Sequence, residues 1–248
     1  MIGIKLTRGK TRRAHEWSTD NPDDIGNQVH QLTNLLDREF ASGRFRTPRE
    51  ATDNIFTAVR GLKAITDELE RSTPVCLEGT LYRARSHDSG VPPADFGPSP
   101  QRSANRFNLE GELAWYVAKT DMILVAELSQ TSPGNCFWVQ RFAAQEIQIK
   151  VLSLTPDMCK DFPALNQFVL LAERKVTDGQ SSPHVATQLL RNLMEQFGFD
   201  AVEYPTVMGD YASDPTATNV AIFNENAIKE CLDSKEGAPY RISEEYVS

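Results

Sequence analysis

The sequence has little sulfur and no arrangement of thiols that is typical of a metal or redox site. Its 248 residues contain four cysteines, and none of them forms a Cys-x-x-Cys pair: Cys76, Cys136, Cys159 and Cys231. We therefore expect reduced thiols in a cytoplasmic protein rather than a disulfide framework. The four histidines lie at no spacing typical of zinc ligands, so no metal site is expected.

Excess positive charge and long apolar segments are also lacking. The 26 Lys and Arg residues are outnumbered by 34 Asp and Glu, which gives a net charge of −8. Broad capture of nucleic acid needs a basic surface, so we expect none, although a local arginine cluster could hold one phosphorylated small molecule. No apolar run approaches the roughly 18 residues of a membrane helix. The basic N-terminal segment lacks the apolar core of a secretory signal, and no membrane association is expected.

The pattern of apolar residues divides the chain into two parts and a tail. Residues 1–75 are expected to be a small helical region, with helices over 24–40 and from a Thr-Pro-Arg-Glu cap at 47–50 to about 71. Residues 76–235 mix short strands with helices in no strict βαβ alternation, which favours the α+β class. Residues 236–248 are expected to be a flexible tail. The expected strands are 79–85, 113–118, 136–142, 147–154, 201–204 and 219–223, and the expected helices are 162–175 and 185–197.

A carboxylate inside an apolar helix is the first candidate for chemistry. Thr120 can cap a helix that starts near Asp121, and Glu127 then lies almost two turns into it. A buried charge is costly unless it is paired, and arginine is its natural partner. Arg83 and Arg85 alternate with Tyr82 and Ala84 along one strand and so face the other side.

Arginines, a tyrosine and a glutamate that converge on one site would suit a nucleotide. Arg83, Arg85 and Arg106 can grip phosphate oxygens, and Tyr116 can stack on a planar heterocycle. Glu127 can bind a ribose hydroxyl and stabilise positive charge at the anomeric carbon. Taken singly, each residue has an ordinary reading: Glu127 in a structural ion pair, Tyr116 in the core, and Arg83 exposed on an edge strand.

Three blocks of sequence also resemble a known family. They are Leu-Tyr-Arg-Ala-Arg at 81–85; a central block from Asn-Arg-Phe-Asn at 105–108 through Ala-Trp-Tyr-Val-Ala at 114–118 to Val-Ala-Glu at 125–127; and Phe-Asp-Ala-Val-Glu-Tyr-Pro-Thr at 199–206 with Asn-Val-Ala-Ile-Phe at 219–223. In order and spacing they are similar to the RES-domain proteins, the toxin halves of bacterial RES–Xre toxin–antitoxin pairs. The blocks span about 75 to 230, and the central one is the most specific.

Three positions depart from the family pattern. The Arg, Glu and Ser of the family name fall on Arg83, Glu127 and Thr206, where threonine keeps the hydroxyl and adds a methyl group. Asn105 stands where the family has Gly, and Asn is the next best residue if that position needs a positive φ. Ala201 replaces another usual Gly, which would be unfavourable in a tight turn.

The resemblance implies a fold and an activity. The fold would be ADP-ribosyltransferase-like, with a mixed β core, flanking helices and a small N-terminal helical region before it. The activity would consume NAD+ as a substrate, with no separate cofactor, by cleaving the nicotinamide–ribose bond. Arg83, Tyr116 and Glu127 would be catalytic. The supporting binding residues would be Arg85, Arg106, Asn108, Thr206 and Asn219.

The fate of the ribosyl group stays open between water, phosphate and a protein side chain. The resemblance therefore implies an NAD+ glycohydrolase or phosphorylase, neutralised by an Xre-type antitoxin. The alternatives are a mono-ADP-ribosyltransferase acting on a protein target and a non-catalytic binding module with the same fold.

Overall fold

The computed structural model describes residues 38, 42, 60–86, 90–131, 136–144, 148–172, 184–206 and 214–242. Its centre is an eight-stranded sheet in the order β1-β5-β6-β7-β3-β2-β4-β8. The strands are β1 (Val75–Cys76), β2 (Thr80–Ser86), β3 (Trp115–Ala118), β4 (Phe137–Ala143), β5 (Lys150–Ser153), β6 (Ala201–Pro205), β7 (Thr218–Ile222) and β8 (Lys235–Ile242). The described helices are α3 (Arg60–Arg71), α4 (Asp121–Thr131), α5 (Pro156–Cys159), α6 (Pro163–Ala172), α7 (Val185–Gln196) and α8 (Glu225–Asp233).

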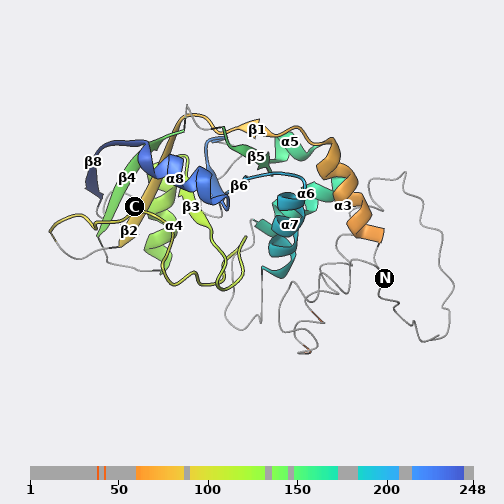
Figure 1. Cartoon of the computed structure of the whole chain (residues 1–248), viewed down its shortest axis with the longest axis horizontal. Helices are drawn as coiled ribbons and strands as arrows, with labels where there is room; N and C mark the ends of the chain where they lie inside the picture. Colours follow the sequence, from red (N-terminus) through yellow and green to blue (C-terminus); the bar gives the residue numbers. More distant parts are fainter. Residues whose placement is uncertain are drawn as a thin grey trace.

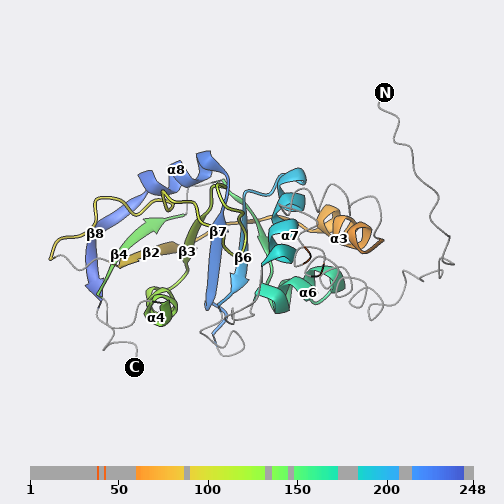
Figure 2. The ribbon, with the colours of Figure 1, turned by 90° about the horizontal axis from the view of Figure 1, so that it is seen from below.

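The expected α+β class, a mixed sheet with flanking helices, is confirmed. Strands β5 and β6 pair in parallel and the other described neighbours pair antiparallel. Figure 1 shows the sheet running along the molecule, with α3, α5, α6 and α7 gathered at one end. Figure 2 shows α4 and α8 covering opposite faces of the other end. The face that carries α4 is the one that matters for the site.

Local signals explain where several helices begin and end. Gly198, with a φ of 77°, follows the C-cap residue of α7, and the main-chain N–H of Phe199 returns to the carbonyl of Met194. This left-handed glycine ends α7 where the sequence predicts. The side chain of Asn224 caps α8 by accepting from the N–H groups of Asn226 and Ala227. Helix α4 begins at Asp121, also as predicted.

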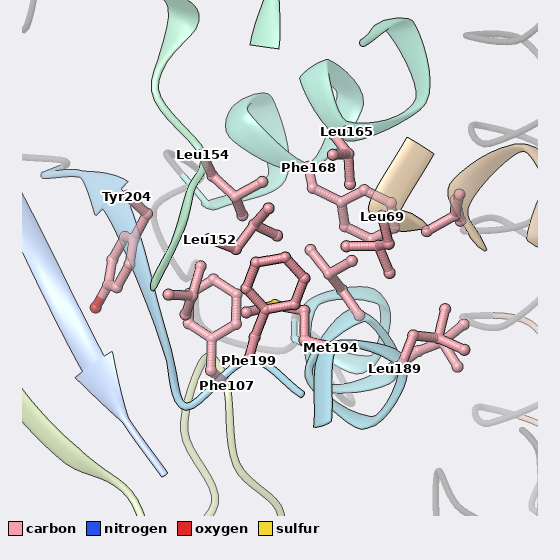
Figure 3. Close-up of a cluster of buried hydrophobic side chains, with 14 of the residues drawn as sticks. Leu69, Phe107, Leu152, Leu154, Leu165, Phe168, Leu189, Met194, Phe199 and Tyr204 are labelled. Carbon is pink, nitrogen blue, oxygen red and sulfur yellow. The ribbon is translucent and has the colours of Figure 1, made fainter. Parts of the chain in front are cut away.

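Helix α3 packs on the sheet domain through one apolar face. Ile65 and Leu69 are almost fully buried in a cluster that includes residues of α6 and α7 (Figure 3). Both carboxylate oxygens of Glu68 accept N–H groups at the start of α6, from Ala164 at 3.0 Å and Leu165 at 2.8 Å. Docking of the N-terminal helices on the second part is thus confirmed for α3. The expected helix over 24–40, apart from the helical residue Arg38, and the cap at 47–50 lie outside the described residues.

The expected flexible tail is wrong at its beginning. Lys235–Ile242 forms β8, which pairs with β4 at the edge of the sheet, from Phe137↔Ile242 to Phe142↔Lys235. Main-chain pairing orders this segment even though most of its side chains are exposed or half-buried. Residues 243–248 lie outside the described part of the chain. Helix α8, which precedes β8, was also not predicted.

The register places several candidate residues on one face of the sheet. Ala118 pairs with Asn219, which pairs in turn with Tyr204, and Tyr116 lies two residues before Ala118. Paired residues share a face and residues two apart along a strand do so too. Tyr116, Asn219 and Tyr204 therefore lie on the face that α4 covers, since Ala118 packs with Ile123 and Leu124 of α4.

Candidate active site

Glu127 has two hydrogen-bond donors, and neither is an arginine. The hydroxyl of Thr206 donates to its Oε1, and the amide of Asn219 donates to the same oxygen at 2.6 Å. Thr206 and Asn219 are each about 3% exposed, and Glu127 is half-buried. No arginine of the described residues forms an ion pair with Glu127, so the predicted arginine partner is wrong.

One carboxylate oxygen of Glu127 is held by neutral donors, and the other can still bind a ligand. Its Oε1 is held by two partners from β7 and the end of β6, which fixes the carboxylate in one orientation. Its Oε2 has no hydrogen bond to the described part of the chain. A carboxylate that is not paired with a cation can accept a hydrogen bond from a hydroxyl group and can stabilise nearby positive charge.

Arg83 reaches the same neighbourhood from the opposite face of β2. The described residues of β2 and β3 pair only at Tyr82↔Ala118, and beyond it the guanidinium of Arg83 donates to the main-chain oxygen of Tyr116 at 2.6 Å. Its Nε is buried and has no partner in the described structure. Burial, together with the charge of Arg85, lowers the pKa of Arg83 to about 10, so it remains a cation at neutral pH.

Tyr116 holds a loop by its hydroxyl. This hydroxyl donates to Oδ1 of Asn108 and accepts the main-chain N–H of Phe107, both at 2.9 Å. The amide nitrogen of Asn108 donates to the carbonyls of Ser103 and Leu109. Burial raises the pKa of Tyr116, which keeps the phenol neutral. Tyr116 and Asn108 thus position the segment that carries Arg106.

Arg106 lies beside an aromatic ring that the sequence analysis did not select. The carbon centre of its guanidinium is 5.5 Å from the ring centroid of Tyr204, within the range of cation–π contacts. Its carbonyl accepts the hydroxyl of Thr187, and the amide of Gln188 donates to the carbonyls of Asn105 and Asn108. The first turn of α7 therefore fixes the main chain around Arg106.

Arg85 is not brought to Glu127. Its guanidinium donates to the carbonyl of Gly97, in the loop after β2, and its charge contributes to the lowered pKa of Arg83. Tyr82 and Ala84 pack on the α4 side, as the period of two predicts, and Arg85 starts from the other side. The structure therefore gives Arg85 a loop-anchoring contact.

Two departures from the family pattern have plain structural outcomes. Arg102 is the one described non-glycine residue with a positive φ, so Asn105 does not need the conformation that glycine favours. The side chain of Asn105 instead accepts the N–H of Arg106 at 2.8 Å. Ala201 lies in β6, fully buried, between Val151 and Ile222, and not in a tight turn.

Tyr204 is the residue that the sequence analysis missed. Its side chain is 5% exposed, and its ring lies 4.9 Å from that of Phe107. In Figure 3 its hydroxyl points away from the apolar cluster. Burial raises the pKa of Tyr204 strongly; Glu127 and Tyr116 raise it further, whereas Arg106 and Arg83 lower it.

Tyr204 lies close to several of the predicted candidates. Arg106 lies over its ring, and Asn219, its partner on β7, and Thr206, two residues further along the chain, both donate to Glu127. The charges of Arg106 and Arg83 also lower its pKa, and those of Glu127 and Tyr116 raise it. The sequence contained one usable signal: the period of two puts Tyr204 on the same face as Thr206. An aromatic residue at the end of a fully buried strand is more commonly a core residue, so Tyr204 was not selected as a site residue.

His184 lies next to Arg106 at the start of α7. Its Nδ1 is buried without a partner in the described residues, and burial together with the charge of Arg106 lowers its pKa to about 4. The imidazole is therefore neutral at physiological pH.

Among the described residues, no group of three His, Cys, Asp or Glu side chains is arranged to hold a metal ion. None of the described helices is long and apolar enough to cross a membrane.

Fold and site together define a class: a mixed α+β domain with a fixed carboxylate, held by neutral donors, beside two arginines and two neutral phenols. The RES domain model matches residues 80–242 of this chain, well over half of its length. The chain belongs to the RES domain family.

The chain was also compared with curated proteins and with solved structures. Comparison with curated proteins gives no match. Among solved structures, a chain of the crystal structure of the M. tuberculosis MbcT–MbcA toxin–antitoxin complex is similar, at 12% identity and a TM-score of 0.49. The similarity covers 75% of this chain and 95% of that chain.

Proposed function

We propose that this protein is a toxin-type enzyme that cleaves the nicotinamide–ribose bond of NAD+, as a glycohydrolase or a phosphorylase. The observation that carries the proposal is the state of Glu127: Oε1 is fixed by Thr206 and Asn219, while Oε2 has no hydrogen bond to the described chain. Membership of the RES domain family supports NAD+ as the substrate and a toxin as the class of protein.

Glu127 would act on the ribose. In the reaction the bond between the anomeric carbon and the pyridinium nitrogen breaks, and nicotinamide leaves with the bonding electrons as a neutral molecule. The ribose is left with oxocarbenium-like positive charge, which a nearby carboxylate stabilises. Oε2 can bind a ribose hydroxyl, which holds the sugar in place. Water or phosphate then bonds to the anomeric carbon, and water releases its proton.

The arginines and Tyr116 would bind the rest of the dinucleotide. Arg83 is a cation at neutral pH and Arg106 lies over the ring of Tyr204, which supports binding of phosphate oxygens by their planar guanidinium groups. Tyr116 is proposed to stack on nicotinamide, while its hydroxyl holds Asn108 and the loop. Asn108, Thr206 and Asn219 are supporting groups, and Arg85 supports the loop at Gly97.

The biological setting belongs to the same proposal. An Xre-type antitoxin that covers the site would keep the enzyme inactive in the cytoplasm, as the family resemblance implies. A co-expressed small Xre-like protein should bind the chain and suppress NAD+ loss. Binding without suppression would contradict this part of the proposal.

The test is Glu127→Gln, assayed by NAD+ loss with purified protein. Glutamine keeps an oxygen that can accept from Thr206 and Asn219, so the unfolding free energy should change by about 1 kcal/mol or less. The negative charge is lost, and the rate should fall by roughly 100-fold or more. Equal rates in the two proteins would contradict the proposal.

A matched control is another buried carboxylate outside the site. Glu203 accepts the hydroxyl of Thr218 at 2.8 Å and pairs with Lys119 at 2.6 Å. Glu203→Gln should lower the melting temperature and leave NAD+ loss nearly unchanged at temperatures where the protein is folded. Mass spectrometry of the products, with and without phosphate and lysate, identifies the acceptor. Protein-linked ADP-ribose as the sole product would replace the glycohydrolase or phosphorylase with a transferase.

A further inference from the structure

Tyr204 combines deep burial with an unused hydroxyl. Its side chain is 5% exposed, and its hydroxyl forms no hydrogen bond with the described chain. This oxygen is not among the buried polar atoms that lack a partner, so it keeps access to solvent and can bind a ligand. The hydroxyl of Tyr116, a half-buried phenol on β3, is by contrast used within the protein, where it has two partners.

The surroundings of this hydroxyl indicate what would satisfy it. The guanidinium carbon of Arg106 is 5.5 Å from the centre of its ring, and Asn219, its partner on β7, donates to Glu127. A cation suited to phosphate and a carboxylate suited to a sugar hydroxyl are therefore both close to Tyr204. Burial raises its pKa well above the ordinary value, so the phenol is neutral and carries a proton that it can donate.

We propose that the Tyr204 hydroxyl donates a hydrogen bond to an oxygen of the ribose-phosphate unit on the nicotinamide side of the dinucleotide. This inference rests on the proposed function. The role is complementary to that of Glu127, because a carboxylate can only accept, whereas oxygens of phosphate and of the sugar need a donor.

The scaffold around Tyr204 holds the ring in place before any substrate arrives. Phe107 packs against one part of the ring, and the guanidinium of Arg106 lies near it. The ring is also part of the apolar cluster that joins the sheet to α6 and α7. Little freedom of the side chain remains to be lost on binding, which favours affinity.

The test is Tyr204→Phe in the full-length protein. Phenylalanine keeps the ring, its packing and the Arg106 contact, and removes an oxygen with no partner in the protein, so the melting temperature should not fall. The value of kcat/KM for NAD+ should fall roughly 10-fold or more, the effect of one lost hydrogen bond. The same kcat/KM in variant and wild type would overturn the inference.

Binding of two nonreactive ligands identifies the acceptor oxygen. ADP-ribose carries the diphosphate and the second ribose, whereas ADP carries the same adenosine diphosphate and lacks the second ribose. Weaker binding of both to Tyr204→Phe supports a phosphate acceptor, and weaker binding of ADP-ribose alone supports a ribose acceptor. Unchanged affinity for both ligands would overturn the inference.

Tyr240→Phe is the matched control, because that tyrosine has a partner away from the site. Its hydroxyl donates to Asp121 at 2.6 Å, between β8 and the start of α4. This variant should be less stable and should keep the wild-type kcat/KM. Failure of the proposed function is recognised separately: a wild-type protein that leaves NAD+ intact overturns both proposals, whereas an active wild type with an equally active Tyr204→Phe overturns only this one.

Discussion

Both hydrogen-bond donors of Glu127 are neutral groups. An arginine at hydrogen-bond distance would cancel much of the carboxylate's field, which is strongest where water is excluded. A hydroxyl from Thr206 and an amide from Asn219 fix its orientation without adding a positive charge. The cost of burying a charge favours an arginine partner. A carboxylate that acts on a substrate is better held by donors that leave its charge uncompensated.

Thr206 is the residue whose substitution tests this view of Glu127. Thr206→Val keeps the shape and removes the hydroxyl that donates to Oε1, so we expect roughly 10-fold slower NAD+ loss and a destabilisation of about 1–2 kcal/mol. Thr206→Ser keeps the hydroxyl, restores the family residue, and should retain the wild-type rate. Kinetics and urea unfolding of the two variants provide the measurement.

The control is a second threonine–glutamate hydrogen bond on the neighbouring strand. Thr218, fully buried in β7, donates to Glu203 at 2.8 Å. Thr218→Val should cost a similar unfolding free energy without slowing NAD+ loss. If the two valine variants slow the reaction equally, the Thr206 hydroxyl has no special relation to Glu127 and the argument fails.

Residue types were easier to predict than residue partners. Motif spacing selected Arg83, Arg106, Tyr116 and Glu127, and the charges of all four shift the pKa of Tyr204 in the folded chain. Their contacts depend on strand register and on the loop before β3, neither of which spacing reveals. Arg85 illustrates the limit: it alternates correctly with Ala84, yet its guanidinium is held by the carbonyl of Gly97.

At the scale of elements, α3 and α6 are joined by a charged cap rather than by apolar contact alone. Both oxygens of Glu68 accept N–H groups from the first turn of α6, and the side chain is 1% exposed. A helix start leaves N–H groups without partners, and a carboxylate there is favourable. Glu68→Ala should therefore cost about 2–4 kcal/mol, measured by urea unfolding, as two N–H groups lose their acceptor.

Asp67 provides the control for this helix contact. It is the neighbouring carboxylate on α3, with a side chain 48% exposed and paired with Lys63. Asp67→Ala should change the unfolding free energy by about 0.5 kcal/mol or less, as for exposed ion pairs. Similar losses in the two variants would show that the α3–α6 cap is not specific to Glu68.

Elements were predictable where periodicity or a capping signal marked them. Helix α7 had an apolar stripe and a terminal glycine, and α4 had a threonine before an apolar run. Strand β8 had neither, because its eight residues are exposed or half-buried and form no buried face. Its order comes from main-chain pairing with β4, a long-range contact that local patterns do not encode.

At the scale of the whole molecule, the site lies on one face of the sheet between two helical groups. Helix α4 brings Glu127 from one side, and α7 fixes the main chain of Arg106 from the other. Tyr204 and Asn219 lie on the strands between them. The division of the chain at residue 75 stays a prediction, and α3 crosses it by contributing to the same apolar cluster as α6, α7 and Tyr204.

This shared cluster predicts that the matched family region is not the smallest stable unit. A chain that starts at Val75 lacks Ile65, Leu69 and Glu68, which are almost fully buried. Their loss exposes the apolar surface that Ile65 and Leu69 cover and leaves two N–H groups of α6 without an acceptor. Together these changes should lower the unfolding free energy by on the order of 5 kcal/mol, a large part of a typical value. The shortened chain should melt well below the full chain and lose NAD+ cleavage on mild heating. The full-length double variant Ile65→Ala/Leu69→Ala should be destabilised in the same direction, because it empties the same positions while keeping every other residue. A shortened chain that melts like the full chain would place the boundary after α3 and make that helix an accessory to the fold.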